Sequence, residues 1–177
     1  MMNHYLYSPF ELAAIIYSYE LNIEEYTILL QKVHRYDNSY LIPEYRQDRK
    51  QFILAVMDKL AYISDPQAYI AERADVEKDM NAFGLDNNDA SQNDLVYSNM
   101  FFKELRIKIK YINTRGFARM KLRTLLSELK YKRRSSSVMD YIQKCLYFYH
   151  IEVTLKGNQP CDLKECSLDD VVIFKVI

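Results

Sequence analysis

The chain has 177 residues, and its 24 Lys and Arg side chains balance its 24 Asp and Glu side chains, so the formal net charge is zero. A composition of 49% hydrophobic and 27% charged residues is globular and excludes an intrinsically disordered chain. Only three Gly and four Pro occur, and an all-β protein would need more turn residues. We therefore expect a mainly helical protein of one domain or two small ones.

The charge is distributed unevenly along the chain. Residues 1–100 carry 8 Lys and Arg against 16 Asp and Glu, residues 101–150 carry 13 against 3, and residues 151–177 carry 3 against 5. Such a split favours an acidic part and a basic part with different partners. The alternative is that the two parts neutralise each other within one fold.

Cysteine usage and the N-terminal residues bear on the compartment. Three cysteines without a framework spacing favour a reducing compartment. The N-terminal residues lack a basic segment followed by an apolar one, so no signal peptide is predicted. The apolar run at residues 12–17 is too short to cross a bilayer. We expect a cytoplasmic protein with no membrane contact.

Four helices are predicted in the acidic part. Ser8, Pro9 and Glu11 form a helix-start signal. Asn22 starts a second helix, with Glu24 and Glu25 in its first turn, and residues 37–39 end this helix. A third helix is predicted from about Pro43 to Ile63, and a fourth from Pro66 to a C-terminal cap at Gly84. Apolar residues at helical spacing are expected to face inward, and they are Leu12, Ile15, Ile16, Tyr19, Tyr26, Leu29, Leu30, Val33, Phe52, Ile53, Val56, Met57 and Leu60.

A polar, acidic segment at residues 86–94 is interpreted as a linker between two domains. It predicts an acidic helical domain over residues 1–94 and a basic domain over residues 95–177. The segment is also compatible with a surface loop inside one compact unit.

The basic part begins with a segment whose structure is ambiguous up to Leu105. In residues 106–112 isoleucine and tyrosine alternate with Arg106, Lys108 and Lys110, which predicts a half-buried strand with a cationic outer face. A turn is expected at residues 113–116, and residues 117–120 are expected to form a short strand.

Two short amphipathic helices are predicted around a basic corner, residues 131–137. Leu122, Leu125, Leu126 and Leu129 form one apolar stripe, and Val138, Ile142, Cys145, Leu146 and Tyr149 form the other. Ser137, three residues before Asp140, is interpreted as the start of the second helix. Strands are expected at residues 152–155 and 171–177, joined by a long loop. Helix, corner, helix and two strands is the order of a winged helix-turn-helix.

The basic cluster is the strongest functional signal in the sequence. The candidate residues for binding nucleic acid or a partner protein are Arg106, Lys108, Lys110, Arg115, Arg119, Lys121, Arg123, Lys130, Lys132, Arg133, Arg134 and Lys144. At the corner, phosphate would meet side-chain charge and the free N–H groups of a helix start. The outward face expected for the second helix, Met139, Asp140, Gln143, Lys144 and Tyr147, reads bases poorly, so strong sequence specificity is not expected. An acidic partner protein and plain solvated charge remain alternatives.

No metal, cofactor or catalytic motif is predicted. Cys145, His150, Cys161 and Cys166 lie close in sequence but lack zinc-site spacing, so Cys145 is expected in the core and the other cysteines in the loop. Single glycines exclude a phosphate loop and a dinucleotide fingerprint, and residues 135–137 lack a nucleophile-elbow frame. We expect a protein that is not an enzyme, although an unrecognised site remains an alternative.

A resemblance adds to this interpretation. Residues 122–177, with the Tyr131-Lys-Arg-Arg-Ser135 corner as the most specific part, resemble a small winged-helix module of bacterial restriction and anti-phage proteins. In layout the chain is similar to the small accessory subunits of Lamassu-type defence systems, which act beside an SMC-like ATPase and a nuclease. The resemblance implies an accessory subunit that docks a partner such as that ATPase and touches DNA or a second partner. A free-standing DNA-binding regulator or antitoxin is the alternative.

Overall fold

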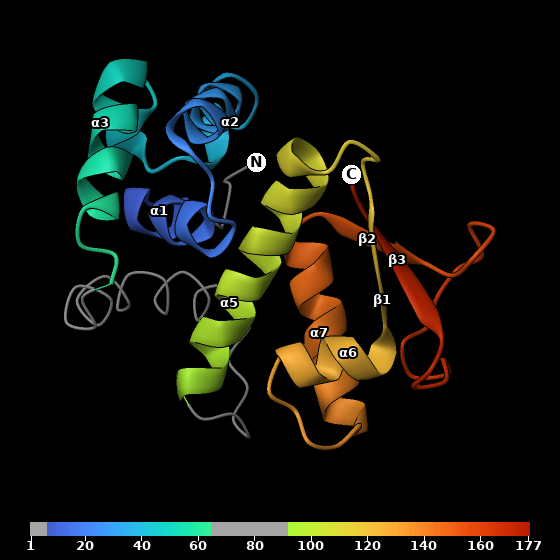
Figure 1. The fold of residues 1–177 in the computed structure, drawn as a ribbon. Helices are drawn as coiled ribbons and strands as arrows, with labels where there is room; N and C mark the ends of the chain where they lie inside the picture. The colour runs from blue at the N-terminus through green and yellow to red at the C-terminus, as the bar shows by residue number, and fades with distance from the viewer. Residues whose placement is uncertain (1–6, 65–91) are drawn as a thin grey trace. The chain divides into compact units, whose positions relative to one another are not determined.

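The computed structural model describes residues 7–64 and 92–177, with side chains from residue 98 onward in the second range. The chain separates into two compact units, residues 1–80 and 81–177, and each is described by itself. Helices dominate the described residues, and the C-terminal unit adds a small antiparallel sheet (Figure 1). The prediction of a mainly helical fold with a small sheet is confirmed.

The first helix of the N-terminal unit, α1 (Pro9–Ser18), starts at the predicted signal. The Ser8 hydroxyl accepts a hydrogen bond from the Glu11 N–H at 3.2 Å, and the Glu11 carboxylate accepts one from the Ser8 N–H at 3.0 Å. This reciprocal capping box satisfies N–H groups that have no partner inside the helix. The predicted inward residues Leu12, Ile15 and Ile16 are buried, whereas Tyr19, which caps the C-terminal end, is only half-buried.

The second helix, α2 (Ile23–Tyr36), is capped in the same way by Asn22 and Glu25. Leu29, Leu30 and Val33 are buried on its inner face, as predicted. The helix ends at Asp37, and one turn of 3₁₀ helix (Asn38–Tyr40) follows.

The third helix, α3 (Arg49–Leu60), starts later than predicted. Pro43 begins only a single 3₁₀ turn (Pro43–Tyr45). The Arg46 carbonyl then accepts a hydrogen bond from the Asn38 side chain at 2.5 Å, and the Arg46 Nε donates to the Leu41 carbonyl at 2.7 Å. Because these bonds hold the segment in a non-helical conformation, the helix begins only after Asp48, whose side chain caps it.

The inner face of α3 also differs in part from the prediction. Phe52 and Val56 are buried, and Ile53 and Leu60 are half-buried. Met57, predicted to face inward, is 40% exposed, so that prediction is wrong. The helix packs on α1 and α2 through a narrower stripe than its apolar residues would allow. The predicted fourth helix, residues 66–84, and most of the predicted linker lie outside the described residues.

The C-terminal unit begins with α5 (Gln92–Ile107), which continues into a short π-helix (Lys108–Ile112). The prediction of a strand over residues 106–112 is therefore wrong. Phe102, Leu105 and Ile109 also follow a helical spacing, and all three are buried. Over so short an apolar run, the same residues fit the spacing of a strand and that of a helix. The segment is helical because the helix buries this stripe in the core.

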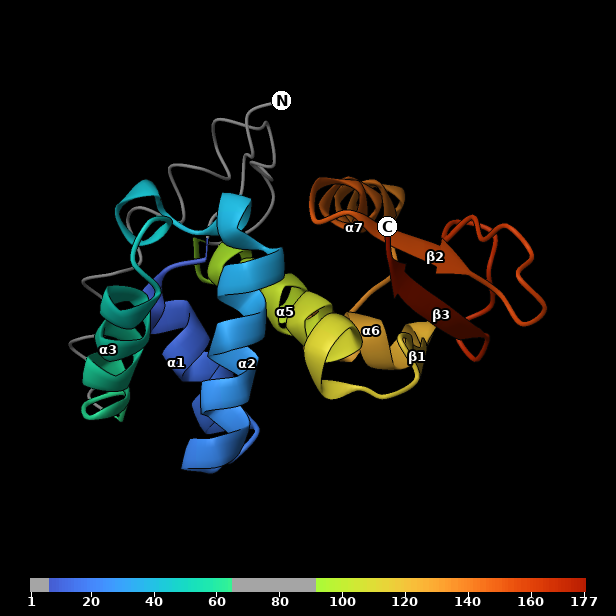
Figure 2. The same cartoon turned by 90° about the horizontal axis from the view of Figure 1, so that it is seen from above.

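The rest of the unit has the element order predicted for a winged helix-turn-helix. Strand β1 (Ala118–Lys121) leads into α6 (Leu122–Glu128) and α7 (Ser136–Phe148), and β2 (Ile151–Thr154) and β3 (Val171–Val176) follow. The sheet is antiparallel with β3 in the middle, and the helices lie on one side of it (Figures 1 and 2). The turn before β1 uses Gly116 at φ 69°, a conformation that glycine adopts without strain.

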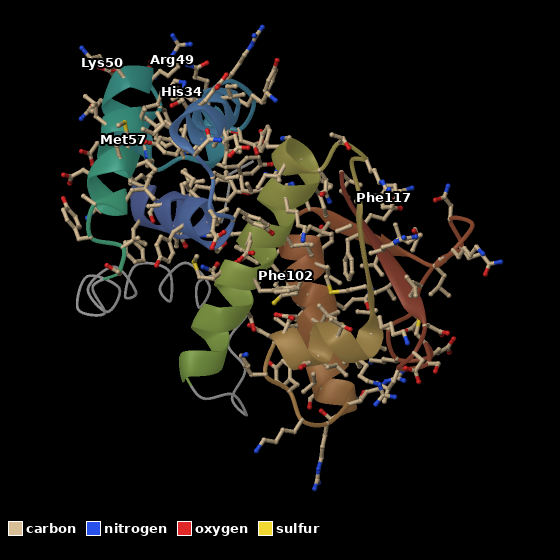
Figure 3. All side chains as sticks on the ribbon, in the orientation of Figure 1. His34, Arg49, Lys50, Met57, Phe102 and Phe117 are labelled. Carbon is tan, nitrogen blue, oxygen red and sulfur yellow. The ribbon has the colours of Figure 1, made fainter. Side chains whose placement is uncertain are left out.

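The core of this unit lies between the helices and the sheet. Most of the predicted stripes of α6 and α7 is confirmed, although Val138 is only half-buried. The buried members are Leu122, Leu125, Leu126, Leu129, Ile142, Cys145, Leu146 and Tyr149. Figure 3 shows Phe102 extending from α5 toward α7, where its ring stacks on that of Tyr149 with centroids 5.7 Å apart. The Tyr149 hydroxyl donates to the Asn99 side chain, which satisfies a polar group in the apolar interior.

Candidate nucleic-acid interface

The basic corner begins where α6 ends. Lys130 adopts φ 63°, its N–H donates to the Ser127 carbonyl at 3.0 Å, and the Tyr131 N–H donates to the Leu126 carbonyl at 2.9 Å. This pair of bonds is a Schellman cap, which satisfies the last carbonyls of a helix and reverses the chain. The reversal carries the chain out of α6 and leads directly into the cationic residues of the corner.

The second helix starts two residues earlier than predicted. Ser135 rather than Ser137 is the cap, because its extended backbone and its hydroxyl, 3.2 Å from the Val138 N–H, satisfy the first turn. The Ser137 hydroxyl lies 3.0 Å from that of Ser135 within the same first turn. The corner is therefore shorter, and the cations at 132–134 lie immediately before the positive end of α7.

Arg134 is held by the protein itself. Its guanidinium donates hydrogen bonds to the backbone carbonyls of Leu163, Lys164 and Cys166, the first at 2.8 Å. We call residues 161–170, the part of the β2–β3 loop that packs on the helix pair, the bracket. Because Arg134 joins the corner to the bracket, we assign its charge mainly a structural role rather than a role in ligand binding.

Lys132 and Arg133 behave differently from their neighbour. Both side chains are exposed, and within the described part of the chain neither forms a hydrogen bond or an ion pair. Lys130, also exposed, has a partner in the structure. The corner thus presents two uncompensated cations beside the N-terminus of α7, where a phosphate oxygen would also meet the helix dipole.

A second cationic site lies where β1 meets α6. Arg119 and Lys121 are exposed two residues apart on β1, and Arg123 is exposed in the first turn of α6. The Asp169 carboxylate of the bracket pairs with Arg123 at 3.2 Å and with Lys121 at 3.7 Å. Hydrogen bonding to Arg123, and then its charge, lowers the pKa of Asp169 below the ordinary value. This junction is therefore partly neutralised, whereas Arg119 has no such pair among the described residues.

The remaining predicted site residues are scattered. Arg106 is only 2% exposed and lies on α5, so it cannot belong to a cationic outer strand face. Lys108 is half-buried and Lys110 is exposed on the π-helix, and both have partners. Arg115 is exposed in the turn before β1, and Lys144 is exposed on α7. The structure therefore does not bring the predicted cations into one continuous patch by way of residues 106–110.

The outer face of α7 has a mixed charge. Asp140, Gln143, Lys144 and Tyr147 are exposed as predicted, but Met139 is buried and belongs to the core. Asp140 pairs with Lys164 of the bracket at 2.6 Å. A groove of about 770 Å³ runs along this face toward β2 and Ile177. This face carries a carboxylate as well as a lysine and a tyrosine, which makes it a poor match for base edges.

Two of the three cysteines lie close together in the structure, which their spacing in the sequence did not predict. Cys145 is buried as predicted, and burial raises the pKa of its thiol to about 12. The Cys161 and Cys166 sulfur atoms lie 3.0 Å apart within the bracket, and both thiols are free. Within residues 7–64 and 92–177, no group of three or more His, Cys, Asp or Glu side chains could hold a metal ion.

The N-terminal unit offers an exposed apolar surface on α3. Leu54 and Met57, one turn apart, are 54% and 40% exposed, and Tyr62 just beyond the helix is also exposed. Figure 3 shows Met57 projecting from the outer side of α3 in this unit, with Arg49 and Lys50 at the start of the helix. Apolar side chains that cluster on a surface are more typical of a binding surface than scattered ones.

Comparison of the chain with protein-family models, with curated proteins and with solved structures gives no match. None of the described helices has the length and apolar character needed to span a membrane.

Proposed function

We propose that this chain is a non-catalytic accessory subunit of a multi-protein complex, of the kind found in the anti-phage systems that its sequence resembles. In this proposal the N-terminal unit docks a partner protein, such as an SMC-like ATPase. The winged-helix unit holds DNA through its phosphates. The observation that carries the proposal is the pair of exposed, uncompensated cations, Lys132 and Arg133, at the start of α7.

The corner is suited to phosphate because three kinds of attraction coincide there. Two side-chain charges, the N-terminal end of the α7 dipole and the N–H groups of its first turn that Ser135 does not cap all favour an anion. Contacts of this kind position a protein on a duplex without reading its sequence. The Asp140 carboxylate on the exposed face of α7 favours the same conclusion, so we propose binding that is not strongly sequence-specific.

The docking part of the proposal is supported by Leu54 and Met57. They lie in the acidic part of the chain, and they expose apolar area on a regular helix. An apolar helix face is a common recognition surface for another protein. The charge split along the sequence agrees with two different partners, because an acidic unit repels phosphate.

The DNA part is tested with Lys132→Ala combined with Arg133→Ala. We expect the affinity for duplex DNA to fall about tenfold, and the slope of log affinity against log salt to decrease by about 2, one for each lost phosphate contact. Binding is measured by fluorescence anisotropy with several unrelated duplexes over a range of salt concentrations. The loss should be the same for all sequences.

The matched control is Arg49→Ala combined with Lys50→Ala, an adjacent and exposed Arg–Lys pair at the start of α3 (Figure 3). It removes the same charge from the acidic unit and should leave affinity and salt slope unchanged. Unchanged binding by the corner variant would refute the phosphate role. A loss confined to one duplex sequence would instead favour a sequence-specific regulator.

The docking part is tested with Leu54→Glu combined with Met57→Glu. We expect a large partner protein that co-purifies with the wild-type chain from its native host in a fixed ratio to be lost, because the charges oppose burial of this surface. Tyr17→Glu with Ile23→Glu, at two other exposed apolar positions of the same unit, is the control and should retain the partner. Retention by the α3 variant as well would contradict the docking surface.

A further inference from the structure

The bracket contains two cysteines that its backbone already holds together. The Glu165 N–H and the Cys166 N–H both donate to the Asp162 carbonyl at 3.0 Å, and the Lys164 N–H donates to the Asp162 side chain at 2.8 Å. This tight turn places the Cys161 and Cys166 sulfur atoms 3.0 Å apart. A disulfide has an S–S bond of about 2.05 Å, so closure requires a movement of about 1 Å.

We propose that Cys161 and Cys166 are a redox modification site that forms a reversible disulfide and locks the bracket onto the helix pair. The two thiols differ in access. Cys161 is only partly buried and can meet a small oxidant, whereas Cys166 is only 6% exposed. Cys161 is therefore the residue that reacts first, and Cys166 resolves the intermediate.

The oxidant is a low-molecular-weight disulfide such as oxidised glutathione. Cys161 loses its proton to solvent, and its thiolate attacks one sulfur of the reagent, which forms a mixed disulfide and releases one glutathione thiol. The Cys166 thiolate then attacks the Cys161 sulfur, which displaces the second glutathione thiol and forms the internal bond. Two protein thiols are oxidised, and one glutathione disulfide is reduced to two thiols.

A disulfide in the bracket affects the contacts that the bracket makes with the rest of the C-terminal unit. Its carbonyls at Leu163, Lys164 and Cys166 hold Arg134, and its Asp169 pairs with the β1–α6 junction. Closing the ring between Cys161 and Cys166 restricts the unfolded chain and fixes the carbonyls that Arg134 uses. The disulfide therefore strengthens the attachment between the β2–β3 loop and the start of α7. This inference does not depend on DNA binding.

The reaction is slow at neutral pH. Burial, followed by the hydrogen bond and charge of Cys166, raises the pKa of Cys161 to about 12, so little thiolate exists at pH 7. The thiolate fraction, and with it the rate of oxidation, should rise about tenfold for each pH unit in this range. The pair therefore responds to sustained oxidising conditions rather than to brief ones.

The test incubates the full chain with mixtures of reduced and oxidised glutathione at pH 8, alkylates the remaining thiols, and digests with trypsin. Lys164 lies between the two cysteines, so cleavage there separates them unless a disulfide joins the two peptides. We expect linked peptides in the wild type while Cys145 is alkylated. Cys166→Ser should instead accumulate glutathione on Cys161, and Cys161→Ser should form neither product.

The structural consequence is measured by thermal unfolding of the oxidised and reduced chains. We expect the disulfide to raise the unfolding midpoint by about 4 °C, as for closure of a short loop. The midpoint of Cys161→Ser should not respond to the oxidant. The proposal is overturned if the wild type retains three free thiols or accumulates glutathione on Cys161, or if the disulfide forms without raising the midpoint.

Discussion

Two cationic sites of the C-terminal unit differ in how their charge is used. The β1–α6 junction presents Lys121 and Arg123, but both pair with Asp169. The corner before α7 presents Lys132 and Arg133, which have no such pair among the described residues. The two sites carry similar charge in the sequence, but Asp169 neutralises part of it at the junction, whereas Lys132 and Arg133 have no ion pair among the described residues. The number of cations in a segment therefore does not measure how much charge a ligand can use.

The same difference appears between two adjacent residues. Arg133 extends into solvent, whereas Arg134 donates to three carbonyls of the bracket. An arginine that satisfies backbone acceptors contributes to stability, whereas an exposed one is available to a ligand. Variants that separate these two roles test the comparison directly.

The largest effect is expected for Arg134→Ala. Loss of the charged donor leaves the bracket carbonyls without their partner, so we expect the free energy of unfolding to fall by about 2 kcal/mol. Arg133→Ala, which removes the same side chain one residue earlier, should change stability by less than about 0.5 kcal/mol. Urea unfolding followed by circular dichroism measures both values. Equal losses for the two variants would contradict the assignment of separate roles.

A smaller effect is expected for Asp169→Asn, which converts the compensated site into an uncompensated one. Lys121 and Arg123 are released from their carboxylate, so duplex affinity should rise about threefold, with a steeper salt slope. Fluorescence anisotropy at two salt concentrations measures both quantities. Glu152→Gln, an exposed carboxylate on β2 that also raises the net charge by one, is the control and should have less effect. An equal rise in both variants would mean that only net charge matters.

The pKa of Asp169 fixes the pH range over which this pair persists. Because Arg123 holds that pKa below its ordinary value, the folded state favours the carboxylate. The contribution of the pair to stability is therefore present above the ordinary pKa of 3.8 and is lost as the pH falls through the lower folded value. At neutral pH the pair is fully charged, so its effect on DNA binding should not vary there.

Local signals were sufficient for much of the fold. The capping box at Ser8, the helix start at Asn22, and the apolar stripes of α6 and α7 each depend on residues a few positions apart. Interactions over such short ranges are encoded by spacing, so the pattern alone predicts them. The position of the basic corner between two helices follows from the same stripes.

The errors occurred where local patterns competed. Residues 106–112 alternate like a strand and also extend the helical stripe of α5, and packing against the core selected the helix. Pro43 resembles a helix start, but hydrogen bonds to and from Arg46 delay α3 until Asp48. Ser135 and Ser137 are both suitable caps, and the backbone geometry at Ser135 decided between them.

The sequence by itself determined the helical stripes, the order of the elements and the presence of a cationic corner, because these depend on the type and spacing of neighbouring residues. Only the tertiary structure decided which cations are available. The bracket supplies the carbonyls that hold Arg134, which lie 29 to 32 residues further along the chain, and the carboxylate that pairs with Arg123. Contacts between residues so far apart are set by the packing of the loop on the helices, which spacing along the chain does not encode.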